Sequence, residues 1–239
     1  MRKGVSKTPC NNQQSILPSF DFEKSLLKKQ QKKNYLALDE VGRGCVFGPV
    51  TVAGILLDTD TIVRLEKLVW LKQVKDSKKI LQKKRDELYE EITEHLPYFI
   101  SHVSCGFIEQ YNINKAIQYA IYRNTLKAKI FLTNLNPHNE LDYLLIDGNY
   151  KFNYPNIRMP QEIPPFFTKV KGDLTCTGIS MASIVAKVSR DNMLTDASDK
   201  YKNYFIEKNK GYGTPQHLAQ IKKFGLTKLH RKSFLKKYL

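Results

Sequence analysis

The stretch YLALDEVGRGCVFGPV, Tyr35–Val50, joins two apolar segments through a pair of acidic residues and a Gly-Arg-Gly motif. The first apolar run stops at Asp39 and Glu40, and the second covers residues 50–57 after a Gly-Pro pair. A hairpin is one interpretation, because acidic residues and glycines favour turns. However, a minimal hairpin needs only two loop residues, and adjacent carboxylates repel each other unless a cation lies between them. The stretch also fits a strand that delivers carboxylates to a site.

The net charge of the chain is +16, and the excess of positive charge lies at its two ends. Residues 1–34 carry eight Lys or Arg and two acids, residues 200–239 carry eleven and one, and the middle is balanced at 20 and 20. Basic ends on a neutral body suit a polyanion such as a nucleic acid. Lysines that only keep the protein in solution are the alternative, and composition alone leaves both open.

The cysteines and the N-terminus indicate the compartment. Cys10, Cys45, Cys105 and Cys176 form no CxxC pair and no zinc-ligand spacing, so we expect reduced thiols in a cytoplasmic protein. The N-terminus lacks the apolar core of a signal peptide, and no apolar run is long enough to span a membrane. We therefore expect no membrane contact.

The hydrophobic periodicity predicts an α/β domain at residues 34–239, preceded by a basic, unstructured extension at residues 1–33. Strands are expected at residues 35–39, 49–57, 98–105, 141–148 and within 164–173, and helices at 61–72, 81–96, 112–132, 180–201 and 215–225. This order predicts a mixed five-stranded sheet with helices on both faces, followed by a basic C-terminal tail that contains a helix.

Two further expected strands also end in an acid, at Asp147 in LLIDG and at Asp173 in KVKGD. Because sites collect at strand ends in such sheets, we expect these residues to join Asp39 and Glu40 in one cluster. Four carboxylates suit Mg²⁺ or Mn²⁺ and not zinc. Two such ions serve phosphodiester cleavage, since one activates water and the other stabilises the leaving oxygen. Each acid taken alone could instead belong to an ordinary turn.

One geometric difficulty concerns Asp39 and Glu40. Successive residues of a strand face opposite ways, so the two carboxylates converge only if the strand twists, bulges or ends there.

The motifs of the chain, taken in order, resemble those of the ribonuclease HII family, the type 2 ribonucleases H. They are DEVGRG with GPV, DSKK with KKRDELYEEI, YNINKA, IDG, KGD, ASIVAKVSRD, KGYGTPQHLAQIKKFG and HRKSF, and they cover residues 35–235. The chain departs from the family pattern at Leu81, where a Ser or Thr usually opens the helix, and at Thr175, where a basic residue is frequent. It also has Leu226 where the family has a proline.

The resemblance implies a ribonuclease H-like fold and an endonuclease that hydrolyses the RNA strand of RNA–DNA hybrids. It also implies cleavage at single ribonucleotides embedded in duplex DNA, with two divalent ions, Mg²⁺ or Mn²⁺, in the site. The alternative is a non-catalytic protein of the same fold that binds hybrids or nucleic acids in general. None of the four carboxylates is missing, which favours the enzyme.

The resemblance also assigns roles to individual residues. The catalytic and metal-binding residues would be Asp39, Glu40, Asp147 and Asp173, and the residues that read the ribonucleotide would be Gly42, Arg43, Gly44 and Tyr212. For Tyr212, a surface aromatic in a Gly-rich turn is the alternative.

Other residues are weighed from their surroundings in the sequence. Lys187 is expected to reach a phosphate, and the loop residues Lys75, Ser77 and Lys78 to touch the DNA strand. We expect Asp191 to form a structural ion pair, Ser183 to pack between helices and His217 to lie at the surface, while His230 and Arg231 could bind phosphate or tie the tail to the body.

A segment in the N-terminal extension points to a protein partner. QQSILPSF, Gln13–Phe20, resembles a sliding-clamp docking peptide. We expect the protein itself to be a monomer.

Overall fold

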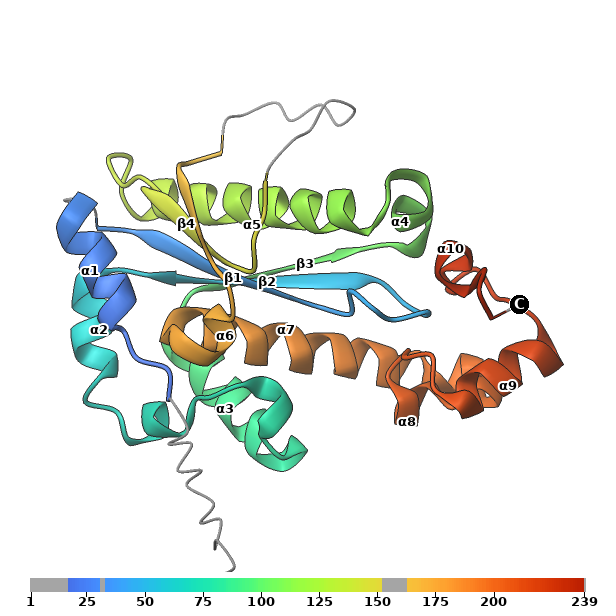
Figure 1. The fold of residues 1–239 in the computed structure, drawn as a ribbon. Coiled ribbons are helices and arrows are strands. Elements are labelled where there is room, and N and C mark those ends of the chain that lie inside the picture. The colour runs from blue at the N-terminus through green and yellow to red at the C-terminus, as the bar shows by residue number, and fades with distance from the viewer. Residues whose placement is uncertain (1–16, 31–32, 152–162, 239) are drawn as a thin grey trace, which may run out of the picture.

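A computed structural model of the chain describes residues 17–30, 33–151 and 163–238. Its centre is a five-stranded sheet with the strand order β3-β2-β1-β4-β5 (Figure 1). The strands are β1 (Tyr35–Val41), β2 (Val50–Leu57), β3 (Tyr98–Val103), β4 (Tyr143–Asp147) and β5 (Phe166–Lys169). The first three pair antiparallel, and β4 and β5 continue the sheet in parallel from β1. The predicted mixed five-stranded sheet is confirmed.

Helices cover both faces of this sheet, as the sequence predicts. The long helix α5 (Ile113–Leu135) lies on one face, with α4 (Cys105–Tyr111) before it, while α7 (Thr177–Asp196) and α3 (Gln82–His95) lie on the other (Figure 1). The alternation of side chains along β1 supplies both cores. Tyr35 and Ala37 pack on the α7 side, and Leu36 and Leu38 pack on the α5 side.

Two short helices replace the helix expected at residues 61–72. Helix α2 (Thr59–Leu65) begins at the Asp58 cap, and a separate 3-10 helix, η1, covers Val69–Gln73. The chain turns between them, and this turn lets both Leu65 and Trp70 enter the α7-side core. A second 3-10 turn, η2 (Ser77–Lys79), precedes α3, which begins at Gln82, and its cap residue Leu81 makes no side-chain cap hydrogen bond. This agrees with the departure noted at Leu81.

The expectation of an unstructured extension through residue 33 is wrong for residues 17–30. Helix α1 (Asp21–Gln30) packs on the sheet end beside α2, and Phe20, Leu26 and Leu27 are buried (Figure 1). The many lysines around these three apolar residues hid a helix with one buried face. Residues 1–16 lie outside the described residues.

The C-terminal tail is helical throughout much of its length and packs on the end of α7. Its helices are η3 (Ser198–Tyr204), α8 (Ile206–Asn209), α9 (Pro215–Phe224) and α10 (Lys232–Leu235) (Figure 1). They form a third core around Phe47, Tyr201 and Tyr204. His217 is buried against this core, so its expected place at the surface is wrong.

The described cysteines, Cys45, Cys105 and Cys176, are buried free thiols, as expected for a chain without disulfides. Within the described part of the chain, no helix combines the length and apolar character needed to cross a membrane.

Candidate active site

The site forms where β1 and β4 leave the sheet side by side. Leu38 pairs with Ile146 in the parallel ladder, so the next residues along the two strands, Asp39 and Asp147, are neighbours at the same end. Alternate residues of a strand share a face, so both side chains lie on the α7 face, the same face as Tyr35 and Tyr143. Two strands therefore deliver two carboxylates to one edge.

Asp39 is buried at the α7 face and is held by polar neighbours. Its Oδ1 accepts a hydrogen bond from the backbone N–H of Glu40 at 2.7 Å, and the Ser183 hydroxyl donates to the same carboxyl group. The Ser183 hydroxyl lies 2.9 Å from that of Ser77. Burial raises the pKa of Asp39 well above its ordinary value, and the neighbouring carboxylates Glu40 and Asp147 raise it further.

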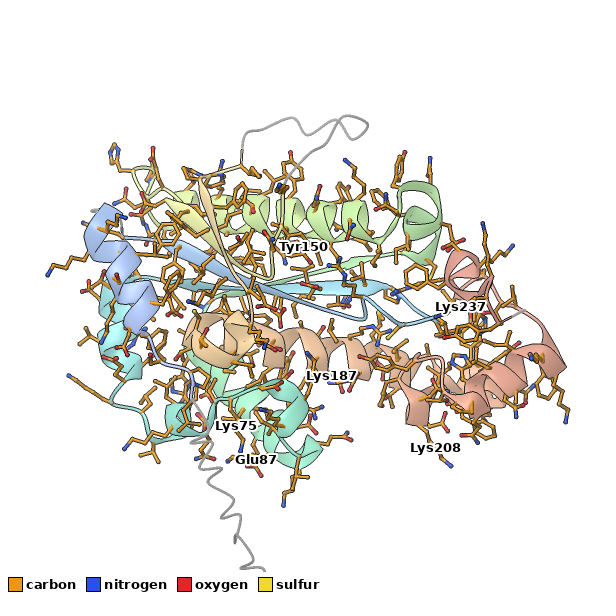
Figure 2. All side chains as sticks on the ribbon, viewed as in Figure 1. Lys75, Glu87, Tyr150, Lys187, Lys208 and Lys237 are labelled. Carbon is orange, nitrogen blue, oxygen red and sulfur yellow. The ribbon has the colours of Figure 1, made fainter. Side chains whose placement is uncertain are left out.

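Glu40 points to the opposite face of β1, toward α5. Its carboxylate accepts from the Tyr150 hydroxyl and lies 3.5 Å from Nη1 of Arg43, which itself donates to Tyr150 at 2.8 Å and to Asn114 at 2.7 Å. Figure 2 shows Tyr150 on the α5 side of the sheet. Burial raises the pKa of Glu40, and Tyr150 and Arg43 oppose this rise. The geometric difficulty foreseen for Asp39 and Glu40 is therefore present in the structure.

Asp147 and Asp173 meet at the start of helix α6 (Gly172–Thr175). The N–H of Gly172 donates to Oδ1 of Asp147 at 2.6 Å. Burial and the Asp173 carboxylate raise the pKa of Asp147. The expectation that Asp173 ends a strand is wrong, because β5 stops at Lys169 and the chain turns through Lys171 in the left-handed conformation before α6 begins.

The four carboxylates are close enough to influence one another's pKa values, but they do not converge on a common metal position. Within residues 17–30, 33–151 and 163–238, no three Asp, Glu, His or Cys side chains converge closely enough to hold a metal ion. Each acid has its own donor or cation instead: Ser183 for Asp39, Tyr150 for Glu40, Gly172 for Asp147, and Lys78, at 3.7 Å, for Asp173. Their chemistry still suits a hard divalent cation, because mutual repulsion is one cause of the raised pKa values of Asp39, Glu40 and Asp147.

Two fully buried arginines fix the loop that contains Gly42, Arg43 and Gly44. Arg231 donates to the carbonyls of Gly42 at 2.7 Å, Arg43 at 3.1 Å and Gly48 at 3.0 Å. Arg190, on α7, donates to the carbonyls of Pro49, Phe47 and Lys210. These bonds join the Gly-Arg-Gly loop to the tail. Of the two roles weighed for Arg231, the structure supports tying the tail to the body.

The two glycines of this loop differ in what surrounds them. Gly42 has a φ of +85°, and a Cβ there would lie 2.4 Å from Nε of Arg190. Gly44 is exposed, and a Cβ there would meet no atom within 4 Å. Only Gly44 therefore leaves its backbone open to a ligand, whereas Gly42 makes room for Arg190.

Tyr212 lies in the tail beside α7, and its side chain is 42% exposed. Nζ of Lys187 lies 6.0 Å from the centre of its ring and also bonds Asp191 at 2.9 Å (Figure 2 labels Lys187 on α7). The ion pair expected for Asp191 is thus confirmed. The tyrosine backbone is fixed as well, since its N–H donates to Asn209 and its carbonyl lies 2.8 Å from Nδ1 of His217.

The loop before α3 divides into surface and buried residues. Lys75 and Lys78 are exposed, whereas Ser77 is buried against Ser183, so its side chain does not face a surface ligand. The packing role expected for Ser183 is incomplete, because it also bonds Asp39. Sequence reasoning missed Tyr150 and Asn114. Their signal was weak, since Tyr150 follows Asp147 by three residues within a loop and Asn114 lies inside the YNINKA motif.

The sheet order, the helices on both faces and the acids at the β1–β4 edge define a protein of the ribonuclease H-like class. The family model described as Ribonuclease HII matches residues 36–237, and the chain belongs to this family. A ribonuclease HII of Caldicellulosiruptor saccharolyticus is 38% identical over 92% of this chain and 95% of its own length. One of Alkaliphilus oremlandii is 38% identical over 93% of this chain and its full length. The chain is thus a metal-dependent ribonuclease.

Solved structures agree with the fold. The ribonuclease HII in the complex with PCNA from Archaeoglobus fulgidus superposes with a TM-score of 0.61 at 24% identity, covering 82% of this chain and 93% of its own. The ribonuclease H2 of Pyrococcus horikoshii gives a TM-score of 0.59 at 21% identity, covering 86% and 96%. At these identities the similarity establishes the fold, and the predicted ribonuclease H-like fold is confirmed.

Proposed function

We propose that this ribonuclease cleaves the RNA strand of RNA–DNA hybrids and also cuts at single ribonucleotides in duplex DNA. Asp39, Glu40, Asp147 and Asp173 would act as its catalytic carboxylates. The observation that carries the proposal is the adjacency of Asp39 and Asp147 at the end of the parallel β1–β4 pair, with Asp173 beside Asp147. The catalytic domain would span residues 34–239.

The acids would hold two divalent ions, Mg²⁺ or Mn²⁺. Bound there, such ions supply an activated water and neutralise charge on the leaving oxygen. The solved structure of Bst-RNase HIII is in complex with Mn²⁺ and has a TM-score of 0.59 to this chain, at 18% identity over 98% of this chain and 75% of its own. Burial and the neighbouring acids raise the pKa values of Asp39 and Asp147, and a cation held between these carboxylates would favour their charged forms.

The residues of the chain then divide the work of binding. Ser183 and the backbone N–H groups of Glu40 and Gly172 orient Asp39 and Asp147. Glu40, two residues beyond the last β1–β4 pair, would be a further ligand. This requires its release from Tyr150 and Arg43.

Recognition of the ribonucleotide would come from the loop and the tail together. The open backbone at Gly44 gives N–H and C=O groups access to the 2′-hydroxyl, which distinguishes RNA from DNA. Arg43, exposed at its guanidinium end, would exchange Asn114 for a phosphate. Tyr212 would pack against the sugar, with Lys187 and Lys75 at the surrounding phosphates.

A sliding-clamp contact is a second proposal, supported by the complex in which the Archaeoglobus fulgidus relative binds PCNA. The candidate peptide is Gln13–Phe20, of which residues 13–16 lie outside the described residues. Phe20 is buried against the protein, whereas Leu17 is exposed. A clamp would therefore have to engage the segment up to Leu17 or displace Phe20.

The main proposal is tested by incubating the protein with a DNA duplex that holds one ribonucleotide, with and without Mg²⁺ or Mn²⁺. We expect metal-dependent cleavage beside the ribonucleotide and none in the matched all-DNA duplex. A protein that cuts continuous hybrids but leaves this duplex intact would limit the function to hybrids. Comparison with Asp147→Asn identifies the site, because an amide cannot supply an anionic ligand.

A further inference from the structure

Helix α1 lies outside the region that the family match covers, which begins at residue 36. It nevertheless packs on the end of the sheet, beside the junction of α6 and α7 (Figure 1). Asp173 lies in α6, which ends two residues later at Thr175, and α7 begins at Thr177. The ribonuclease HII relatives align over 92% and 93% of this chain, so their alignments extend into α1. Helix α1 therefore contacts the structure that holds a proposed catalytic residue.

Glu23 of α1 is fully buried, which is unusual for a carboxyl group. Its Oε1 accepts a hydrogen bond from the N–H of Gly178 at 3.0 Å, in the first turn of α7. Its Oε2 has no hydrogen-bond partner in the structure, and neither have the buried hydroxyls of Tyr35 and Tyr143. Those two rings stack at 5.3 Å on β1 and β4. Gly178 lies against the Tyr35 hydroxyl, since a Cβ there would be 3.4 Å from it, so the bond from Gly178 to Glu23 joins α1 to α7 next to β1.

Gly178 has no space for any larger residue at this contact. A Cβ there would lie 3.0 Å from Cβ of Ala37 and 3.0 Å from Cδ1 of Leu57. The start of α7 thus lies directly on the sheet, and the Glu23 side chain contacts this first turn of α7 through its bond with Gly178. The hydrogen bond from Gly178 has a fixed geometry for that reason.

A second contact connects the same two segments. The N–H of Ser19 donates to the carbonyl of Thr175 at 3.3 Å, and the N–H of Thr177 donates to the carbonyl of Ser19 at 3.2 Å. Within the junction, the Ser180 hydroxyl donates to the carbonyl of Asp173 at 2.7 Å. Residues 175–178 are therefore held by α1 and by Ser19, two residues before it, and the first turn of α7 is bonded back to Asp173.

We propose that α1 is a positioning element for the reaction, in which Glu23 fixes the α6–α7 junction and thereby the carboxylate of Asp173. The proposal rests on the role proposed above for Asp173. Helix α6 is a single turn without a side-chain cap, so its orientation depends on the segments at its two ends. Gly172 is held at one end by Asp147, and Thr175 is held at the other by Ser19.

The test compares Glu23→Met, which keeps the bulk and removes the acceptor, with Glu23→Gln, which keeps the acceptor. Glu66→Ala is the matched control, because Glu66 binds Lys24 of the same helix at 2.6 Å on its exposed side. For Glu23→Met we expect kcat to fall on the order of tenfold with an unchanged KM for the nucleic acid, since a displaced carboxylate affects the chemical step. We expect Glu23→Gln and Glu66→Ala to match the parent protein.

Amide hydrogen exchange of the metal-free proteins supplies a readout that is independent of turnover. We expect faster exchange at residues 173–178 in Glu23→Met alone. Unchanged kcat and unchanged exchange in this variant, with only a lower melting temperature, would overturn the proposal and leave α1 with a role in stability alone. A loss of kcat that Glu23→Gln shares would also contradict it.

Two further variants keep the test decisive. If Glu23→Met does not fold, Glu23→Asp shortens the side chain by one methylene and should give the same pattern in a milder form, and a parent-like kcat there would reject the proposal. Asp173→Asn separates the two hypotheses. If it retains turnover, the proposed role of Asp173 is wrong, whereas a loss of turnover with a parent-like Glu23→Met rejects only the role of α1.

Discussion

The ammonium nitrogen of Lys78 lies 3.7 Å from a carboxylate oxygen of Asp173. Burial acts to lower the pKa of Lys78, but Asp173 and Asp39 outweigh it and raise the pKa above its ordinary value. The lysine side chain is 78% exposed, so it can move away when another cation or a phosphate enters. Lys78 thus acts as a counter-charge for the acids.

Replacing Lys78 by Met should strengthen metal binding. An exposed ion pair contributes about 0.5 kcal/mol, which corresponds to roughly a twofold change in the dissociation constant for Mg²⁺ or Mn²⁺. Calorimetric titration of the metal into both proteins measures this change, and Lys79→Met is the control at the neighbouring exposed position. Weaker metal binding in Lys78→Met would show that the lysine organises the acids and does not compete with the ion.

Metal should stabilise the protein through Asp147. An ion present at tenfold its dissociation constant adds about 1.4 kcal/mol to the free energy of unfolding, which raises the melting temperature by about 3–5 °C in a chain of this size. Asp147→Asn should fold, lose nearly all cleavage and lose most of this shift. Asp199→Asn, on an exposed carboxylate in the tail, should keep both. A melting curve of the parent protein that does not respond to metal would exclude a site at these acids.

The two glycines of the Gly-Arg-Gly motif should respond differently to alanine. Gly42→Ala places a side chain at positive φ, which costs about 1–2 kcal/mol, and adds a clash with Arg190. Urea unfolding should therefore show a loss of at least this size. Gly44→Ala should leave the unfolding curve unchanged and raise KM, because its Cβ points into open space where substrate is proposed to lie. Equal effects of both changes on stability would contradict this division.

Glu23 should make the protein less stable as the pH rises. Burial raises its pKa from 4.5 to about 7 in the folded protein. Between these two values the unfolded chain releases the proton while the folded one keeps it, so the free energy of unfolding falls with increasing pH, by at most about 3 kcal/mol. Glu23→Gln has no such proton. The stability of the variant relative to the parent should therefore rise from pH 4.5 to 7 and level off above, whereas a difference independent of pH would mean that Glu23 is ionised in the fold.

The sheet and the acids at the ends of β1 and β4 could be predicted from the sequence. Buried strands appear as apolar runs, and a carboxylate directly after such a run stands out from it. The sequence predicted the wrong element for Asp173, since the turn at Lys171 depends on a left-handed residue other than glycine. Helix α1 was missed because its buried face has few apolar residues among lysines. Its buried acid, Glu23, has a hydrogen-bond partner, Gly178, that lies 155 residues further along the chain. Contacts between distant segments, such as those of Arg190 and Arg231, leave no local pattern.

Tyr212 should determine which substrate is cut. Its backbone is fixed by Asn209 and His217, and its half-exposed ring stands beside Lys187, so Tyr212→Ala removes the ring without releasing the loop. A ring packed against one sugar at a junction between RNA and DNA matters most when a single ribonucleotide has to be recognised, because a continuous hybrid offers many ribonucleotides for cleavage. We expect the variant to lose at least tenfold more rate on a duplex with one ribonucleotide than on a continuous hybrid, measured as kcat/KM for both.

The matched control is Tyr212→Phe, which keeps the ring and removes the hydroxyl. If packing on the sugar carries the selectivity, Phe should retain most of the activity on the single-ribonucleotide duplex. If Phe loses as much as Ala, the hydroxyl makes the decisive contact. Equal losses of Tyr212→Ala on both substrates would mean that the ring assists cleavage in general and does not read the junction, since a residue that only supports the fold or the metal site has no means of distinguishing the two duplexes.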